Sequence, residues 1–499
     1  MANPRQSREF PVNPTNTSGY LVPNKVLAAL PRCRPFAGPQ LRPQTEINRH
    51  DLFGKFDHAS CLSNIVRSGG TGLPRLIVIG AGPMGLAAAY QAVLDGHEVD
   101  VLEANAEAGG MAGHFDFGGI SIERFYHFVC RADKPTFQLL AELGIAEKLR
   151  WKDTSMGFFS GGRLNRWGDP VSLLRLRGPS LITKLRYGLF VLLCTRKKQW
   201  PALETTSAKD WIVRWCGTDG YERFWRDLLQ YKFYEYGNSI SAAWIWTRIR
   251  RVGSSRKSTM QEELGYIEGG SQTLIDALVS AIKSRGGRIH LNSPAQRVTV
   301  SNGCAVGVDT PTDHLPADFV IATIPIANVS RLIPELPDAW KRRYDAVKNI
   351  GICCVIFKLK RSVSPHFWVN VVDTSHEIPG VIEFTNLRTV GPTIVYVPYY
   401  MPVTNPKFGW TDEVMIDDAF DCLTKLNPQL VREDLIEAKV ARLRHAQPVC
   451  EVGFAAMLPP VQTPIRGLQI ADTCFYYPED RGIAESVRLG REMARATVE

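Results

Sequence analysis

The sequence has no long apolar run. The longest, Tyr187–Cys194 (YGLFVLLC), is far shorter than the ~20 residues that a membrane-spanning helix requires. The first residues, Met1–Pro14, contain no apolar segment of the kind that marks a secretory signal. We therefore expect a protein that does not span a membrane and that is located in the cytoplasm.

The cysteines and histidines lack the spacing of a metal site or of a disulfide framework. There are 11 cysteines, none of them in a CxxC arrangement, and the 10 histidines form neither HxxxH nor HExxH. Scattered cysteines of this kind are typical of free, buried thiols in a reducing compartment. The sequence therefore predicts no metal site.

Patterns for nucleic-acid binding are also lacking. No zinc-finger spacing and no aromatic ribonucleoprotein motif accompany the net charge of +9. The basic balance leaves three explanations open: an anionic membrane surface, an anionic substrate or a solvated basic surface. We expect a small-molecule substrate and no nucleic-acid partner, and nothing in the sequence sets an oligomeric state.

Residues 1–72 differ in composition from the rest of the chain. They are rich in proline and polar residues and end in RSGGTG, a composition typical of flexible linkers. We expect a disordered N-terminal extension. A transit peptide and a start codon placed too far upstream are the alternative explanations.

The ordered chain is predicted to begin near Leu73 with a strand–helix–strand unit. Leu76–Ile79 is the continuous apolar run of a strand that is buried on both faces of a parallel sheet. Met84–Leu94 is an apolar, alanine-rich helix with Gly96 as its C-cap, and Glu98–Leu102 alternates as a second strand. The unit predicts an α/β protein with a Rossmann-type dinucleotide-binding domain.

A GxGxxG motif joins the first strand to the helix. Gly80 permits the tight turn, Gly82 lets the backbone approach a pyrophosphate, and Gly85 lets the helix pack on the strand. The free N–H groups at the start of the helix can bind phosphate. Glu103, at the end of the second strand, can accept hydrogen bonds from a ribose diol. These residues predict a bound dinucleotide, either FAD or NAD.

A second glycine pair, Gly109–Gly110, favours FAD. The surrounding stretch, LEANAEAGGMAG, resembles a loop of the flavin amine oxidase superfamily, which includes monoamine and polyamine oxidases, protoporphyrinogen oxidase and the carotenoid desaturases. In such proteins small residues let backbone N–H groups approach the FAD diphosphate. No second GxGxxG for a nicotinamide follows Gly113. The resemblance therefore implies FAD as the cofactor.

Three later segments resemble the same superfamily in the same order. The first contains GYIEGGSQTLIDALVS and leads to the position beside the adenine, and the second, VIATIP, resembles a sheet strand. The third, which begins LQIADTCFYYPEDRG, resembles a closing segment in which an acid lies near the ribityl-phosphate region and a helix N-terminus faces the flavin pyrimidine. With the glycine pair, the resemblance implies cofactor contacts at Gly109, Gly110, Met111, Val298, Asp472, Arg481, Gly482 and Ile483.

The sequence departs from the superfamily pattern at Glu107 and Met111, where arginine is frequent. The diphosphate contact of the first of these arginines is therefore in doubt, or another arginine makes it. Nothing in the sequence explains why an acid stands at Glu107.

The order of these segments divides the ordered chain into two predicted domains. Residues 73–130, 262–330 and 450–499 form the FAD-binding domain. Residues 131–261 and 331–449 form an inserted α+β substrate domain, because they contain helical stretches rich in tryptophan and arginine and several β-rich runs.

The resemblance implies an FAD-dependent oxidoreductase. It would oxidise an organic substrate of the amine or CH–CH type by hydride transfer to flavin N5, while the protein supplies orientation and electrostatics. The alternative is a redox-neutral sugar isomerisation, because UDP-galactopyranose mutase shares this architecture. That reaction requires paired arginines for a diphosphate, for which Trp246–Lys257 (WTRIRRVGSSRK) is a weak candidate.

His127 is the candidate catalytic group. It follows the strand that leaves the predicted cofactor site, and a histidine can act as a base near neutral pH. It can equally be a histidine that is packed at a domain interface. Lys232, Tyr234 and Tyr236 are alternative pocket residues.

One stretch, Leu173–Trp200, combines apolar runs with many basic residues and is predicted to be helical. It can form an amphipathic face that contacts a membrane surface, so the protein would be peripheral there. The alternative is a substrate-domain helix with a solvated basic side. The basic residues are Arg175, Arg177, Lys184, Arg186, Arg196, Lys197 and Lys198.

Overall fold

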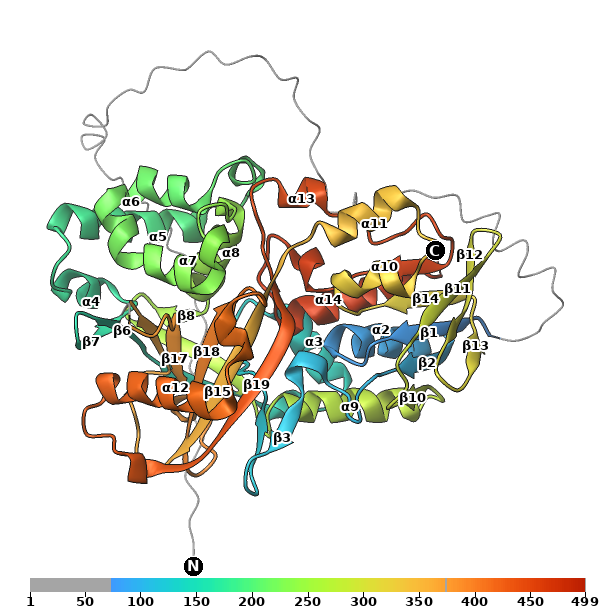
Figure 1. Ribbon diagram of the computed structural model, residues 1–499, viewed down its shortest axis with the longest axis horizontal. Coiled ribbons are helices and arrows are strands. Elements are labelled where there is room, and N and C mark those ends of the chain that lie inside the picture. The colour runs from blue at the N-terminus through green and yellow to red at the C-terminus, as the bar shows by residue number, and fades with distance from the viewer. Residues whose placement is uncertain (1–72, 373–374, 499) are drawn as a thin grey trace, which may run out of the picture. The chain divides into compact units, whose positions relative to one another are not determined.

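Two sheets organise the chain (Figure 1). The computed structural model describes residues 73–372 and 375–498, so the expectation for residues 1–72 lies outside the described residues. The first sheet is parallel and five-stranded. In spatial order it contains β10 (Arg288–His290), β2 (Glu98–Leu102), β1 (Arg75–Ile79), β14 (Phe319–Ala322) and β20 (Leu468–Ile470).

The parallel sheet is buried because other elements cover it. Leu76–Ile79 of β1 are all at most 3% exposed. α2 (Pro83–Leu94) packs on β1, β2 and β14, and α9 (Ser271–Lys283) and α14 (Ile483–Arg495) pack beside α2. This arrangement confirms the predicted α/β fold with a Rossmann-type unit.

A close helix contact brings α14 against α2. A Cβ built at Gly490 of α14 would lie 2.2 Å from the carbonyl oxygen of Met84, so only glycine permits this distance. α2 follows β1, and α14 follows β20 after a short 3₁₀ turn. Because β1 and β20 are parallel, both helices begin at the carboxyl edge of the sheet.

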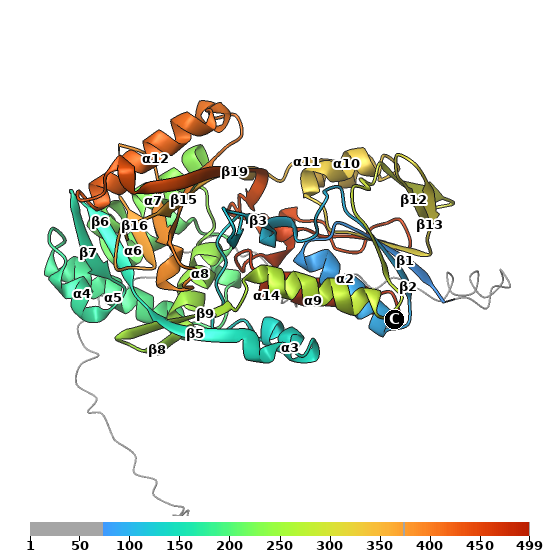
Figure 2. The same ribbon diagram turned by 90° about the horizontal axis from the view of Figure 1, so that it is seen from below.

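The second sheet is seven-stranded and mixed. In spatial order it contains β19 (Leu435–Pro448), β15 (Asn349–Leu359), β18 (Thr393–Met401), β17 (Gly380–Glu383), β16 (Trp368–Val371), β6 (Met156–Ser160) and β7 (Arg163–Trp167). Only the β16–β6 pair is parallel among the pairings described. Figures 1 and 2 show α12 (Asp412–Leu426) on one side of this sheet and the helices α5 to α8 on the other.

The helices beside the second sheet carry the residues that later matter for the site. They are α4 (Pro170–Arg175), α5 (Leu181–Arg196), α6 (Ala208–Phe224), α7 (Arg226–Phe233) and α8 (Ala242–Ser254). Among the described residues, none of the helices is long and apolar enough to cross a bilayer.

The remaining elements connect or cover the two sheets. The strands are β3 (His114–Asp116), β4 (Ser121–Glu123), β5 (Leu149–Thr154), β8 (Arg256–Ser258), β9 (Gln261–Ile267), β11 (Arg297–Ser301), β12 (Cys304–Asp309) and β13 (His314–Pro316). The helices are α3 (Lys134–Glu142), α10 (Val329–Leu332), α11 (Asp338–Asp345) and α13 (Phe454–Met457).

Most predicted elements agree with the structure, and two differ from it. The stretch Leu173–Trp200 forms two helices rather than one, because Gly178 and Pro179 interrupt it between α4 and α5. The VIATIP segment, which resembles a sheet strand, is extended only as far as Ala322, where β14 ends. All strands of the five-stranded sheet come from the three ranges assigned to the FAD-binding domain, and all strands of the seven-stranded sheet from the two assigned to the substrate domain. The division into two domains itself stays a prediction.

Candidate active site

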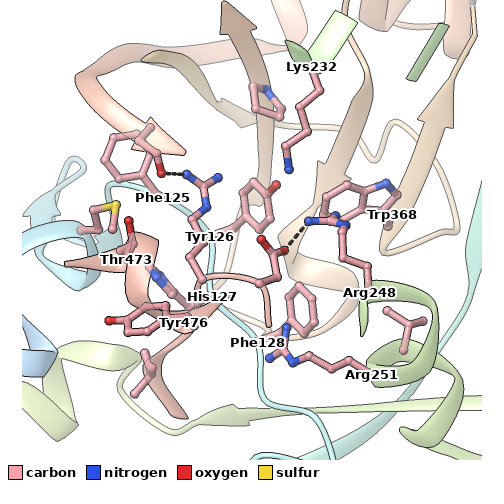
Figure 3. Close-up of a pocket in the computed structure, with 18 of the residues that line it drawn as sticks. Phe125, Tyr126, His127, Phe128, Lys232, Arg248, Arg251, Trp368, Thr473 and Tyr476 are labelled. Carbon is pink, nitrogen blue, oxygen red and sulfur yellow. Dashed lines mark hydrogen bonds and ion pairs between the residues drawn. The ribbon is translucent and has the colours of Figure 1, made fainter. Parts of the chain in front are cut away.

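A cavity of about 1520 Å³ lies between the two sheets (Figure 3). Its wall includes Ile79 at the end of β1, Trp368 of β16 and Tyr400 of β18. Pockets for single small ligands are usually of ~300–1,000 Å³. The cavity is therefore large enough for a dinucleotide and a second molecule.

The glycine motif forms one end of the cavity. Gly80 has φ +102°, a conformation that glycine adopts without strain. A Cβ built at Gly85 would lie 1.9 Å from the carbonyl oxygen of Gly80, so α2 can begin here only with glycine. A Cβ at Gly110 would lie 3.1 Å from the Cα of Gly82. The two glycine loops thus touch through bare backbone. The N–H groups of Gly80 and Gly109 donate to the carbonyl oxygens of Leu102 (2.8 Å) and Ala81 (2.8 Å), whereas Gly82 and Gly110 place their backbone in the cavity wall, where a ligand can approach it.

Glu103 lies at the end of β2 and joins the two loops. Its Oε2 accepts a hydrogen bond from the Ala81 N–H (2.9 Å), and its Oε1 accepts from the N–H (2.9 Å) and the Nδ2 (2.6 Å) of Asn105. A carboxylate offers about four lone-pair sites, so one remains. Because Glu103 also lines the cavity, that site is available to a hydroxyl group of a ligand.

The start of α14 faces the same cavity. Gly482 is its N-cap, and Gly482, Ile483 and Ser486 line the wall. A helix N-terminus stabilises negative charge on a neighbouring ligand. Asp472 also lines the cavity, but its carboxylate accepts hydrogen bonds from the N–H groups of Ile326 (2.8 Å) and Cys474 (2.8 Å), while burial raises its pKa.

Arg481 connects the start of α14 to the opposite sheet. It donates to the carbonyl oxygen of Ala446 and to the hydroxyl of Tyr400 (2.9 Å), and the Tyr400 hydroxyl lies 3.3 Å from that of Tyr126. The chain of contacts runs from the helix N-terminus to Tyr126 in the wall of the cavity.

The far part of the cavity is a chamber of aromatic and charged side chains. Figure 3 shows Tyr126, Phe128 and Trp368 around this space, with Lys232 from α7 and Arg248 and Arg251 from α8. Arg248 pairs with Asp480, and Arg251 pairs with Asp133 (2.8 Å). Both arginines are thus compensated by acids.

His127 lines the cavity beside this chamber. Burial lowers the pKa of His127 to about 4, and Glu123 opposes that effect only in part. Its buried Nδ1 has no hydrogen-bond partner among the described residues. The imidazole is therefore neutral at pH 7 and is a weak proton acceptor.

A buried ion pair links the cofactor side of the cavity to the seven-stranded sheet. Glu123 of β4 pairs with Arg388 (3.1 Å), and the two residues are 2% and 8% exposed. His114 lies 3.5 Å from the Glu123 carboxylate, and the Ser271 N–H donates to it (3.2 Å). A Cβ at Gly270 would collide with all three side chains, so this glycine makes the cluster possible.

The mouth of the cavity is apolar and exposed. Four leucines of α4 and α5 line the cavity and yet are 44–60% exposed: Leu174, Leu185, Leu189 and Leu192. On the outside of α5, Leu181 and Ile182 are 62% and 70% exposed. Together these residues form the α4–α5 face, an apolar surface that continues into the cavity.

The cavity brings together most of the predicted site residues. Those that line it are Gly80, Gly82, Glu103, Gly110, Met111, His127, Asp472, Arg481, Gly482 and Ile483. Gly85, Gly109 and Val298 are not part of the lining, and Val298 is fully buried in β11, whereas Pro294 and Ala295 before it do line the cavity. Of the alternative pocket residues Lys232 lines the cavity, and Tyr234 and Tyr236 do not.

Residues 85–459 match the model of one protein family, the flavin-containing amine oxidoreductases. The chain belongs to this family. Members contain a flavin, and FAD is the cofactor, as the glycine motifs predict. Members of this family are flavin-containing oxidoreductases.

The chain is similar to plant and cyanobacterial desaturases. It is 25% identical over 294 residues to 15-cis-phytoene desaturase of Synechococcus elongatus, a match that covers 54% of this chain and 60% of the relative. It is 24% identical over 473 residues to the 15-cis-phytoene desaturase of Arabidopsis thaliana, covering 85% and 80%. The chain thus spans about three-fifths of the length of the first of these relatives.

The fold of this amine oxidoreductase is also similar to solved structures. A proposed protoporphyrinogen oxidase from Exiguobacterium sp. 255-15 matches with a TM-score of 0.68 and 18% identity, over 86% of this chain and 99% of the other. Reduced UDP-galactopyranose mutase matches with the same TM-score and 16% identity, over 86% and 94%. Because an oxidase and a mutase fit equally well, the similarity establishes the fold and leaves the reaction open.

The residues of the cavity fit FAD. The paired glycine loops form a cradle that a Cβ would fill, and Glu103 keeps one lone pair for a hydroxyl group. Two helices of at least 12 residues, α2 and α14, begin at this cavity and provide free N–H groups for anionic ligand atoms.

Proposed function

We propose that this protein oxidises an apolar organic substrate at an amine or a CH–CH bond. When bound, FAD supplies two-electron oxidation by accepting a hydride at N5. The observation that carries the proposal is that a single cavity contains both the glycine cradle and the aromatic chamber. A substrate in the chamber would be adjacent to the cofactor and shielded from water.

Each part of the cavity has a distinct task in this proposal. The backbone of Gly82 and Gly110 would hold the diphosphate, and Glu103 would hold a ribose hydroxyl. The N-terminus of α14 would stabilise negative charge near the flavin pyrimidine. The aromatic side chains of the chamber would orient the apolar substrate.

The α4–α5 face supports substrate entry from a membrane surface. Isolated exposed leucines are ordinary, but here a continuous apolar surface opens into the cavity. Several basic residues flank it: Arg175, Arg177, Lys184, Arg186 and Arg196. An apolar helix face with basic flanks is suited to the interface of an anionic bilayer. We propose that the protein docks there and takes its substrate from the bilayer.

The redox function is tested with the purified protein and its cofactor. The protein should contain FAD, and anaerobic addition of the correct amine or CH–CH substrate should bleach the flavin absorbance. A panel that contains both substrate classes would separate them. A preparation that binds no FAD would overturn the proposal.

Membrane docking is tested by sedimentation with vesicles. Binding should be stronger to vesicles with anionic lipid than to neutral vesicles. The double variant Leu181→Ser with Ile182→Ser should bind more weakly to both kinds of vesicle. The matched control is Val431→Ser with Ile436→Ser, because those residues are also exposed apolar residues, at 48% each, and lie outside the cavity. Equal binding by the two double variants would contradict the proposal.

The mutase reaction has less support from the cavity. The arginines of the Trp246–Lys257 stretch that would have to bind a diphosphate are paired: Arg248 with Asp480, Arg250 with Glu479 and Arg251 with Asp133. The test is to supply a UDP-sugar to the anaerobically reduced protein. Turnover without net electron consumption would reject the oxidase proposal.

A further inference from the structure

Lys232 differs from the other cations of the chamber because, among the described residues, its amine has neither an acid partner nor a hydrogen-bond acceptor. Arg248 and Arg251 each form an ion pair, and Arg481 is held by two oxygen acceptors. Within residues 73–372 and 375–498, no carboxylate forms an ion pair with the Lys232 ammonium. This amine is therefore the cation with bonding capacity left for a ligand.

Aromatic rings surround the Lys232 amine. Its Nζ lies 4.9 Å from the ring centre of Trp244, 5.0 Å from that of Tyr400 and 5.6 Å from that of Phe233. Figure 3 shows the side chain extended into the pocket rather than folded back on α7. Three rings fix the position of the amine, and none of them can neutralise a full positive charge.

The electrostatic surroundings disfavour the charged form of this amine. Burial lowers the pKa of Lys232 well below its ordinary value, and the positive charges of Arg248 and Arg481 lower it further. Asp480 and Cys450 raise the pKa of Lys232, but the Asp480 carboxylate is already paired with Arg248. An anionic group beside Nζ would reverse the balance and favour the protonated form.

The same cavity leads from this amine to the apolar mouth. The leucines of the α4–α5 face and the amine of Lys232 line one continuous wall. A ligand that lies along this wall would therefore have an apolar body. Only its inner end would meet a single unpaired cation.

We propose that Lys232 receives a carboxylate at the inner end of an amphipathic substrate whose apolar chain extends toward the α4–α5 face. The inference rests on the proposed function, because it names the substrate class of that site. A single amine suits a monoanionic carboxylate, whereas a diphosphate requires several cations. The carboxylate would accept a charge-assisted hydrogen bond from the Lys232 ammonium and would favour that charged form.

The test is a binding experiment on the purified holoprotein with decanoate and decan-1-ol as probes. We expect decanoate to bind roughly ten- to a hundredfold more tightly than the alcohol of the same chain length. Isothermal titration in buffers with different heats of ionisation should show proton uptake, at most one per decanoate, above the pKa of the free amine. The alcohol should bind without proton uptake.

Two variants make the assignment specific. Lys232→Met keeps the length of the side chain and should abolish both the preference for the acid and the proton uptake, while alcohol binding persists. Lys232→Arg should retain the preference without the uptake, since arginine is always charged. The matched control is Lys184→Met, another lysine of the cavity wall, which donates to the Leu174 carbonyl oxygen (2.8 Å) and should leave the preference unchanged.

The outcomes separate this inference from the proposed function. Equal affinities for acid and alcohol, a preference that survives Lys232→Met, or no binding of either probe would overturn the inference. Melting temperatures of the variants show whether a loss reflects unfolding. Acid preference without any substrate oxidation would contradict the proposed function and leave the inference standing.

Discussion

The two ends of the cavity are built in different ways. The cofactor end is formed by backbone: glycines at positions where a Cβ would collide, and the first turns of α2 and α14. The substrate end is formed by side chains from α7, α8, β16 and β18. The first construction tolerates little change, because a Cβ at Gly85 would lie 1.9 Å from the Gly80 carbonyl oxygen. The second consists of side chains, which can be exchanged with smaller changes to the backbone.

The backbone end should be the less tolerant of the two. Gly85→Ala would place a Cβ 1.9 Å from the Gly80 carbonyl oxygen, so the start of α2 must move away from β1. We expect loss of bound FAD and a destabilisation of at least about 3 kcal/mol. Urea unfolding and flavin content measure the two effects.

A matched control exists for that substitution. Gly409 has no atom within 4 Å of a built Cβ and does not require a positive φ. Gly409→Ala should therefore change stability by about 0.5 kcal/mol or less. Retention of FAD and of the melting temperature by Gly85→Ala would show that the glycine turn is not a rigid element.

The buried ion pair between the two ends should come next in size. Arg388→Met leaves the Glu123 carboxylate buried without its cation, which costs about 3–5 kcal/mol in other proteins. The double variant with Glu123→Gln should recover part of this loss, because the uncompensated charge is gone. Denaturant unfolding of the wild type, of Arg388→Met and of the double variant measures the loss of stability and its partial recovery.

An exposed ion pair provides the comparison. Arg150 and Glu268 lie 2.9 Å apart with side chains that are 53% and 55% exposed. Arg150→Met should therefore cost no more than about 1 kcal/mol. If the two arginine variants were equally stable, the Glu123–Arg388 pair would not hold the two ends of the cavity together.

The chamber should show a smaller, pH-dependent effect through His127. The folded pKa of about 4 lies below the ordinary value of 6.5, so the folded protein resists protonation of this ring. The resulting stabilisation is complete above pH 6.5 and is lost as the pH falls toward 4. The difference corresponds to at most about 3 kcal/mol.

Unfolding free energies at pH 7 and pH 4.5 test whether stability falls with pH in this direction. His127→Gln removes the titrating ring, so its stability should fall less between the two pH values than that of the wild type. An equal fall in both proteins would mean that His127 is hydrated and titrates normally. His127 would then remain a candidate catalytic base near neutral pH.

The contrast between a backbone-built end and a side-chain-built end also explains which parts of the site the sequence could predict. The glycine turn and Glu103 follow from short local patterns, and Gly80, Gly82 and Glu103 lie in the wall of the cavity. The chamber residues Trp244, Tyr400 and Asp480 come from distant segments with no shared motif, so no spacing indicated that they would meet. The break of the Leu173–Trp200 stretch was visible in its Gly178–Pro179 pair.

Val298 shows the limit of a resemblance. The segment that carries it lies near the cavity, but strand residues alternate between two faces, and this side chain points into the core. The preceding loop residues Pro294 and Ala295 line the cavity instead. A matched segment therefore locates a region, whereas the contacting residue depends on register.

The smallest expected effect concerns a charged side chain at the cofactor end. The superfamily arginine is replaced by Glu107, but Arg124 lines the cavity and lies 3.4 Å from the Glu107 carboxylate. We predict that Arg124 supplies the missing positive charge, and that Arg124→Met weakens FAD binding by about 1 kcal/mol, close to tenfold or less. Titration of the apoprotein with FAD measures this change.

Glu107→Gln is the control for Arg124, because it releases the arginine without removing its charge. It should leave FAD affinity unchanged or raise it slightly, and the effect of Arg124→Met should shrink at high salt, since both side chains are largely exposed at 45% and 68%. If Arg124→Met bound FAD as tightly as the wild type at low salt, the backbone would be sufficient for the diphosphate. The acid at Glu107 would then be tolerated because the glycine loops and the N-terminus of α2 already provide the positive end of a dipole and free N–H groups.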